Sequence, residues 1–132
     1  MGTLRIDFGN AEIKVFNEAV AAGSFSISAD AAQQAKRQYD LMLSELARVR
    51  QTFKSATHFS GFGGFRSAQE LQDGFVGKAI VGMAVIDQLT DVVRQIQVAY
   101  LRAGKQFAEA DQIDAARLKQ LTTAAVDAGG LQ

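Results

Sequence analysis

Two long segments of this 132-residue chain repeat apolar residues every three to four positions, and the glycine-rich segment 58–66 separates them. Each glycine inside a helix costs roughly 1 kcal/mol relative to alanine, so the three glycines within positions 61–64 are expected to interrupt helical structure. Three phenylalanines alternate with these glycines and need an apolar surface to pack on. The sequence therefore predicts an all-α helix–turn–helix hairpin with aromatic side chains anchoring its turn.

The first periodic segment predicts a helix over residues 28–57. Ser28 stands at a position suited to an N-cap, and Asp30 lies in the first turn, where a carboxylate suits the positive end of the helix dipole. The apolar positions alternate in spacings of three and four, as in a heptad seam. They are Ala32, Ala35, Tyr39, Met42, Leu46, Val49, Phe53 and Ala56.

The second periodic segment predicts a helix over residues 67–118, either one long helix or two collinear ones that break at Gly104. Ser67 and Glu70 have the spacing of a capping box at its start. The same rhythm of three and four continues for more than five heptads. Its main apolar positions are Phe75, Ile86, Leu89, Val93, Ile96, Tyr100, Phe107 and Ala110.

A second apolar row on this helix predicts association with another chain. Val81, Val85, Val92 and Ala99 widen the apolar stripe beyond what one antiparallel partner helix covers. Two hairpins packed as a four-helix bundle would bury the seams of all four helices, which a lone hairpin cannot do. We therefore expect a dimer, which can be a homodimer or a heterodimer.

The two predicted helices differ in length, at roughly 45 Å and 75 Å for a rise of 1.5 Å per residue. Folding back from the turn places Ser28 near Ile96. Residues beyond about Val98 are then expected to overhang the hairpin, unless the N-terminal residues or a partner cover them.

The two ends of the chain are treated separately from the hairpin, which spans 28–118. In the N-terminal extension 1–27, Leu4–Phe8 and Glu12–Phe16 alternate around Gly9 and Asn10, which is typical of a short β-hairpin, whereas 15–22 can equally be a short helix. Residues 119–132 are expected to form a flexible C-terminal tail that frays.

Composition excludes several classes of protein. Lys and Arg together number 14, as do Asp and Glu, so no net charge favours nucleic acid or an anionic membrane. The absence of cysteine removes disulfides and thiol chemistry. The apolar run 79–86 is far shorter than the roughly 20 residues of a membrane-spanning helix. The N-terminus carries charges among its apolar residues, unlike a cleaved signal peptide.

The chain offers little for catalysis, and we expect neither an enzyme nor a cofactor or metal site. His58 is the only histidine, so no two-histidine metal site can form within one chain. Glu109, Asp111 and Asp114 are expected to lie on a solvated helix surface, where carboxylates keep ordinary chemistry. The glycine-rich turn lacks the Gly-Lys-Ser/Thr ending of a phosphate-binding loop. Tyr39 and Tyr100 occupy seam positions and are expected to pack rather than stack on nucleic acid.

The two helices and their turn resemble the small WXG-type, ESAT-like proteins of the type VII (ESX) secretion systems of actinobacteria and firmicutes. The turn match is Phe62-Gly63-Gly64, with phenylalanine where the family has tryptophan. A second match is Phe107–Asp111, with phenylalanine for tyrosine in the family's export signal of tyrosine, three residues and an acid. The resemblance covers roughly 28–117.

This resemblance implies a non-enzymatic protein that is made in the cytoplasm, is exported as a folded helical dimer without a cleaved signal peptide, and becomes secreted or associated with the cell envelope. It also implies recognition by the membrane ATPase of the secretion system. Phe107 and Asp111 would form the export signal, whereas a purely structural interpretation makes Phe107 a seam residue and Asp111 a solvated charge. The alternative functions are a cytoplasmic dimerisation adaptor and a chaperone-like partner for a larger toxin or effector.

Overall fold

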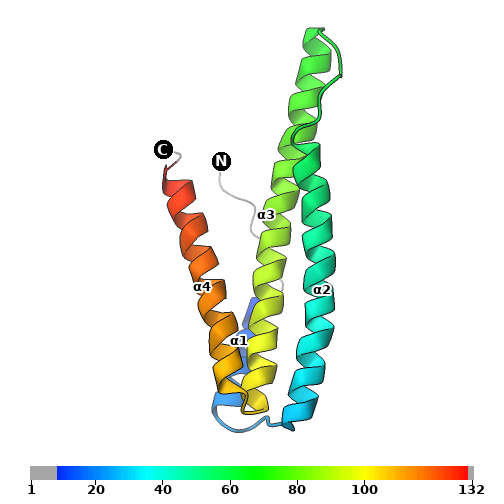
Figure 1. Ribbon diagram of the computed structural model, residues 1–132. Coiled ribbons are helices and arrows are strands. Elements are labelled where there is room, and N and C mark those ends of the chain that lie inside the picture. Colours follow the sequence, from blue (N-terminus) through cyan, green and yellow to red (C-terminus); the bar gives the residue numbers. More distant parts are fainter. Residues whose placement is uncertain (1–8, 131–132) are drawn as a thin grey trace.

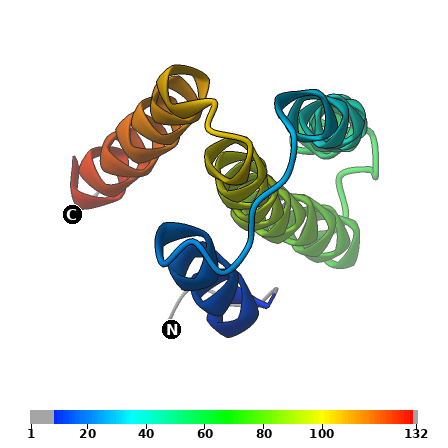
Figure 2. The same ribbon diagram turned by 90° about the horizontal axis from the view of Figure 1, so that it is seen from below.

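One long helix, Arg66–Ala103, is the centre of the fold: a second helix runs along most of its length, and two others pack against its lower part (Figure 1). The computed structural model describes the backbone of residues 9–130 and the side chains of residues 9–123. Within that range the chain forms only helices: α1 (Asn10–Ala21), α2 (Ala29–Ala56), α3 (Arg66–Ala103) and α4 (Phe107–Gly130). α1, α2 and α4 each pack against α3 (Figure 1). Viewed along the axis, they lie on three different sides of it (Figure 2). The predicted all-α class is confirmed.

Helix α2 begins and ends within one residue of the predicted limits. The Ser28 hydroxyl accepts a hydrogen bond of 3.1 Å from the Ala31 amide, so Ser28 is the N-cap that the sequence predicts. Asp30 lies in the first turn of the helix. α2 runs antiparallel to α3 and makes its most extensive helix–helix contact (Figure 1).

The start of α3 differs from the predicted capping box. The helix begins at Arg66 with Phe65 in the N-cap position, and no side chain caps it. Ser67 is therefore already inside the first turn, whereas a capping serine must precede the first helical residue. The side chain of Gln69 instead ties the helix to the turn, because its Nε2 donates a 2.6 Å hydrogen bond to the Gly63 carbonyl.

The break at Gly104 is confirmed, but the two helices on either side of it are not collinear. α3 ends at Ala103, and the chain reverses so that α4 folds back along α3 (Figure 1). Gly104 sits where a Cβ atom would collide with the Cβ of Ala32 and would lie 3.1 Å from the Ser28 carbonyl oxygen. The Ile27 amide donates to the Ala103 carbonyl at 3.1 Å. Residues beyond Val98 do not overhang, because α3 ends level with the start of α2. The stated alternative holds, since the N-terminal residues cover this end through Phe16 on Tyr100 and Ile27 on Ala103.

The register of the hairpin also differs from the prediction. Ser28 lies opposite Gly104 rather than Ile96. The reason is the path of the turn, which rises alongside the first turns of α3 instead of reversing tightly at the end of α2 (Figure 1). α2 is thereby shifted by about two turns relative to a symmetric hairpin.

Both ends of the chain are more helical than expected. Residues 12–16 lie within α1, so the predicted β-hairpin is wrong and the helical alternative holds, while its other arm, 4–8, lies outside the described residues. α1 packs on α3 through Phe16, whose ring centroid is 5.2 Å from that of Tyr100. The predicted tail 119–132 is helical as far as Gly130.

The core lies at the base, where the four helices meet. Most of its fully buried apolar residues come from the last three turns of α3, and single residues from the other helices complete it. They are Ile13, Ala32, Val92, Val93, Val98, Ala99, Leu101, Ala103 and Ala110. Among the described residues, no helix has the length and hydropathy needed to cross a membrane.

Candidate functional site

The predicted turn motif forms a loop held by an aromatic cluster. The rings of Phe59 and Phe62 lie 5.0 Å apart, and both pack on Phe75 of α3 at 5.3 and 6.0 Å between centroids. Gly61 and Gly63 have φ angles of 97° and 109°, which side chains rarely adopt, so glycine is required there. The third phenylalanine, Phe65, is 82% exposed and anchors nothing.

The predicted seam residues occupy three different environments. Leu46 and Val93 are buried between α2 and α3. Partly buried members are Phe53, Ile86, Leu89, Ile96 and Tyr100. Val49 and Phe75 remain 41% and 44% exposed. The seam thus closes in the lower hairpin, while its role in joining two chains stays a prediction.

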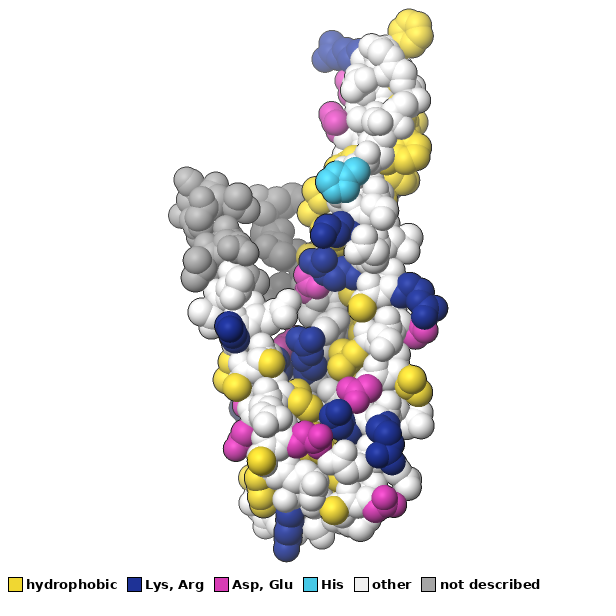
Figure 3. Space-filling view, viewed as in Figure 1, with side chains coloured by type: hydrophobic (Ala, Val, Ile, Leu, Met, Phe, Trp, Pro, Cys, Tyr) yellow, Lys and Arg dark blue, Asp and Glu magenta, His cyan; other side chains and the backbone are white. Residues whose placement is uncertain are grey.

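The upper hairpin, which we define as residues 47–86, projects beyond α1 and α4 at its tip (Figure 1). It rises above the rest of the molecule in Figure 1, and apolar side chains lie along it and at its tip in Figure 3. Its exposed large apolar residues are Val49, Phe59, Phe65, Leu71, Phe75, Ile80 and Val81. An exposed apolar surface of this kind is typical of an interface with another protein.

The proposed signal residues, Phe107 and Asp111, lie one turn apart at the start of α4. Phe107 is 56% exposed. The Asp111 side chain is 72% exposed, and its Oδ1 lies 3.6 Å from an Nη atom of Arg102. Their i, i+4 spacing places both side chains on one side of α4. They therefore lie at the base of the hairpin, within reach of solvent.

A ladder of ion pairs joins α4 to α3, and sequence reasoning missed it. Arg117 bridges Asp91 of α3 and Asp114 of α4, each at 3.2 Å, in a site where all three side chains are less than 30% exposed. Arg102 adds a longer contact of 3.7 Å to Asp114. The spacing of Asp114 and Arg117 is visible in the sequence, but no local pattern connects either residue to Asp91.

A polar cluster fixes α2 against α3. Gln97 is only 1% exposed, and its Nε2 donates to the Lys36 carbonyl at 3.0 Å and to Asp40 Oδ1 at 2.8 Å. Lys36 Nζ lies 3.0 Å from Asp40 Oδ2. Burial raises the pKa of Asp40, but the hydrogen bonds from Gln97 and Lys36 and the Lys36 charge outweigh it and lower that pKa.

Two tyrosines stack beside this cluster. The rings of Tyr39 and Tyr100 are 6.0 Å apart and nearly parallel. Burial raises the pKa of Tyr39, and the adjacent Tyr100 adds to the shift. Both are partly buried in the helix contact, as their seam positions predict, and neither is arranged as a ligand-binding group.

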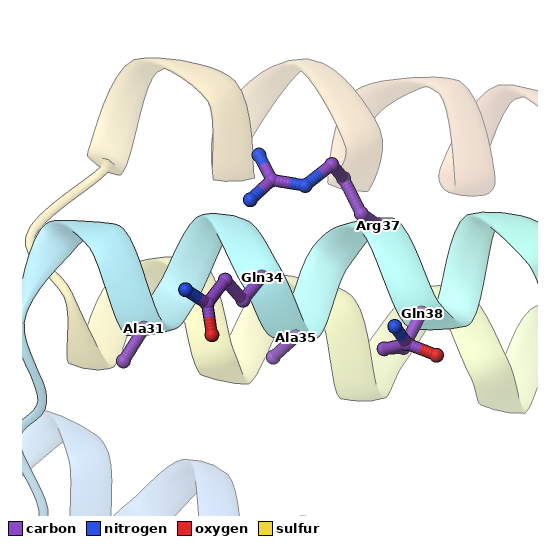
Figure 4. Close-up of a pocket in the computed structure, with 5 residues that line it drawn as sticks. All are labelled: Ala31, Gln34, Ala35, Arg37 and Gln38. Carbon is purple, nitrogen blue, oxygen red and sulfur yellow. The ribbon is translucent and has the colours of Figure 1, made fainter.

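The remaining hollow of the surface has no features of a binding pocket. It is lined by Ala31, Gln34, Ala35, Arg37 and Gln38, which all belong to α2 (Figure 4). A site enclosed by one helix cannot bury a ligand, because pockets are normally concave and formed by several elements. Within the part of the chain that the structure describes, no three His, Cys, Asp or Glu residues converge as metal ligands would.

Comparison of the chain with protein-family models, with curated proteins and with solved structures found no match.

Proposed function

We propose that this chain is a non-enzymatic interaction protein that a type VII (ESX) secretion system exports as a folded helical pair. The partner is either a second copy or a related helical-hairpin protein. The membrane ATPase of the secretion system recognises the pair through Phe107 and Asp111. The chain is then secreted or held at the cell envelope.

The observation that carries this proposal is the bare upper hairpin. Helices α1 and α4 pack against the lower part of α3, and apolar side chains beyond them remain in water. Ile80 and Val81 are 53% and 47% exposed on different faces of the helix, which leaves more than one direction for a partner. Burying a side chain of this size contributes about 1.5–3 kcal/mol, so a second hairpin would gain substantially by packing there.

The exposure of Phe107 supports its role in recognition. A phenylalanine that is 56% exposed contributes little to the core and is free to insert into a pocket of another protein. Asp111, one turn further along, offers a carboxylate beside it for a basic group of the partner. Aromatic residues are enriched at the centre of protein interfaces, and polar groups lie at the rim.

The test is the secretion of the tagged protein from an actinobacterial host whose type VII ATPase is intact or deleted. Export should require the ATPase, and the Phe107→Ala/Asp111→Ala variant should remain folded but stay in the cells. The matched control is Leu41→Ala/Glu45→Ala, which removes another exposed apolar residue and, one turn further along the same helix, another exposed carboxylate. Equal secretion of the signal variant and the wild type would refute the signal.

Retention of the wild-type chain in the cytosol, even when it is co-expressed with its genomic neighbour, would refute export altogether. The same protein would then be a cytoplasmic adaptor or a chaperone-like partner, since both use the bare hairpin in the same way. The partner distinguishes these two functions. An adaptor forms a dimer with itself, whereas a chaperone-like protein binds a larger effector through its apolar surface.

A further inference from the structure

The sequence and the structure disagree at the junction of α3 and α4, and the disagreement is informative. The apolar rhythm of α3 continues without interruption through Tyr100, Ala103, Phe107 and Ala110. Such a pattern favours one continuous helix with a single apolar face. The chain nevertheless reverses over residues 104–106.

The reversal requires a backbone conformation that its sequence does not favour. Lys105 has a φ angle of 60°, and it is the only non-glycine residue with positive φ in the described range. A helix that ends with a left-handed residue normally has glycine there, because a side chain clashes in that region. The turn has backbone hydrogen bonds of its own, from the Gln106 amide to the Leu101 carbonyl at 2.7 Å and from the Lys105 amide to the Arg102 carbonyl at 3.0 Å. Contacts between α3 and α4 offset the remaining cost of a lysine in this conformation.

Every one of those contacts depends on the reversal. Val98 and Leu101 of α3 pack with Ala110 and Ile113 of α4. The Arg102–Asp111 ion pair could not form in a continuous helix, where nine residues separate the two by roughly 13 Å along the axis. The pair between Arg117 and Asp91 would be separated further still.

We propose that α4 is a hinged arm that pivots at residues 104–106 between the closed form of this structure and an open form in which α3 and α4 are one helix. In the closed form Arg102 holds Asp111 in an ion pair, and opening releases it. The consequence for export rests on the proposed function: the ATPase binds the open form, in which Asp111 is released from Arg102 beside a Phe107 that is already exposed. A partner selects this form by binding it more strongly, through the apolar face that α4 uncovers on α3.

The hinge can be measured as a distance. The chain has no cysteine, so Ser44→Cys and Lys119→Cys provide two unique sites for spin labels, and both are exposed. Ser44 lies between Asp40 and Arg50, which contact Gln97 and Asp87 of α3, and Lys119 lies next to the Arg117–Asp91 contact. In the closed form the two labels therefore lie at similar positions along the axis of α3. Straightening moves Lys119 by roughly 40 Å, since 28 residues separate it from Asp91.

Two substitutions at Lys105 make a matched pair, because both remove the same charge. Lys105→Gly suits the left-handed turn and weakens a continuous helix, whereas Lys105→Ala has the opposite preferences. Each preference changes the equilibrium constant between the open and closed forms by about fivefold. The ratio of open to closed form should therefore be at least about tenfold higher with alanine than with glycine. Both are placed in an Arg102→Gln background, which removes the ion pairs of a partly exposed side chain.

Pulsed dipolar measurements should show a population with the longer distance in the alanine chain. In the glycine chain this population should be at least about tenfold smaller. Circular dichroism confirms that both chains are equally helical. A single short distance in both would overturn the hinge. The measurement needs no secretion system, so a populated open form together with normal export of the Phe107→Ala/Asp111→Ala variant would refute the proposed signal and leave the hinge standing.

Discussion

Gly82 lets α3 approach Phe53 of α2, and its replacement by alanine tests how tightly the hairpin is packed. A Cβ atom at position 82 would lie 2.7–2.9 Å from three ring carbons of Phe53. Carbon atoms in favourable contact are about 3.5–4.0 Å apart, so the ring or the helix must move by nearly 1 Å. Overpacking of this kind typically costs about 1–3 kcal/mol.

The helix propensity of alanine acts in the other direction and has to be separated from this cost. Replacing a glycine inside a helix by alanine gains about 1 kcal/mol. Gly77 provides the control, because it lies in the same helix and a Cβ there would meet nothing within 4 Å. Gly77→Ala should therefore stabilise the protein by about 0.5–1 kcal/mol. The difference between the two variants isolates the packing cost, since the propensity gain is common to both.

Urea unfolding followed by circular dichroism at one fixed protein concentration measures both free energies of unfolding. The fixed concentration matters because a dimer gains stability by mass action. Gly82→Ala should be less stable than Gly77→Ala by about 1–3 kcal/mol. Equal free energies of unfolding for the two variants would show that Phe53 is not held against Gly82, and the packing derived for the hairpin would be refuted.

Three further predictions concern the polar cluster and the upper hairpin. Gln97→Leu removes the donor to Asp40 and to the Lys36 carbonyl, and unfolding in urea should show a loss of about 1–3 kcal/mol, which an unchanged midpoint would contradict. Because the folded-state pKa of Asp40 is lowered, its contribution to stability is present above its unfolded pKa and is lost as the pH falls through the lower, folded value. Unfolding midpoints measured between pH 6 and pH 2 should therefore fall less for Asp40→Asn than for the wild type. Parallel curves for the two proteins would show that Asp40 does not contribute to the pH dependence of stability. Val81→Glu places a charge on the exposed row of α3 and should shift light scattering from the mass of a dimer to that of a monomer; an unchanged mass would exclude Val81 from the interface.

Local sequence signals predicted the hairpin because the forces behind them act over a few residues. The periodicity of Leu46 and Val93 reflects the 3.6-residue turn of a helix, and both side chains are buried where the helices meet. Ser28 caps α2 as expected, since the capping bond spans only three residues. The break at Gly104 was predicted because glycine weakens a helix, although Gly74, Gly77 and Gly82 lie inside α3 without breaking it.

The same local signals failed where one sequence pattern is compatible with two different local structures. The capping-box spacing of Ser67 and Glu70 predicted Ser67 as the N-cap, but the N-cap is Phe65, two residues earlier, and no side chain caps the helix. Residues 12–16 alternate as a strand would, but they are helical because Phe16 packs on Tyr100, 84 positions further along the chain. Nothing near Phe16 in the sequence indicates that contact.

The sequence by itself thus determined that this protein is helical, where α2 lies and at which residue, Gly104, a break in the second helical segment would fall. Only the tertiary structure decided that α4 folds back along α3, that the turn rises beside α3 and that the upper hairpin is left bare. The reversal depends on the contacts of Arg117 with Asp91 and of Ile113 with the core, which join residues far apart in the chain. Such contacts are chosen by packing in three dimensions, and periodicity along one helix carries no information about them.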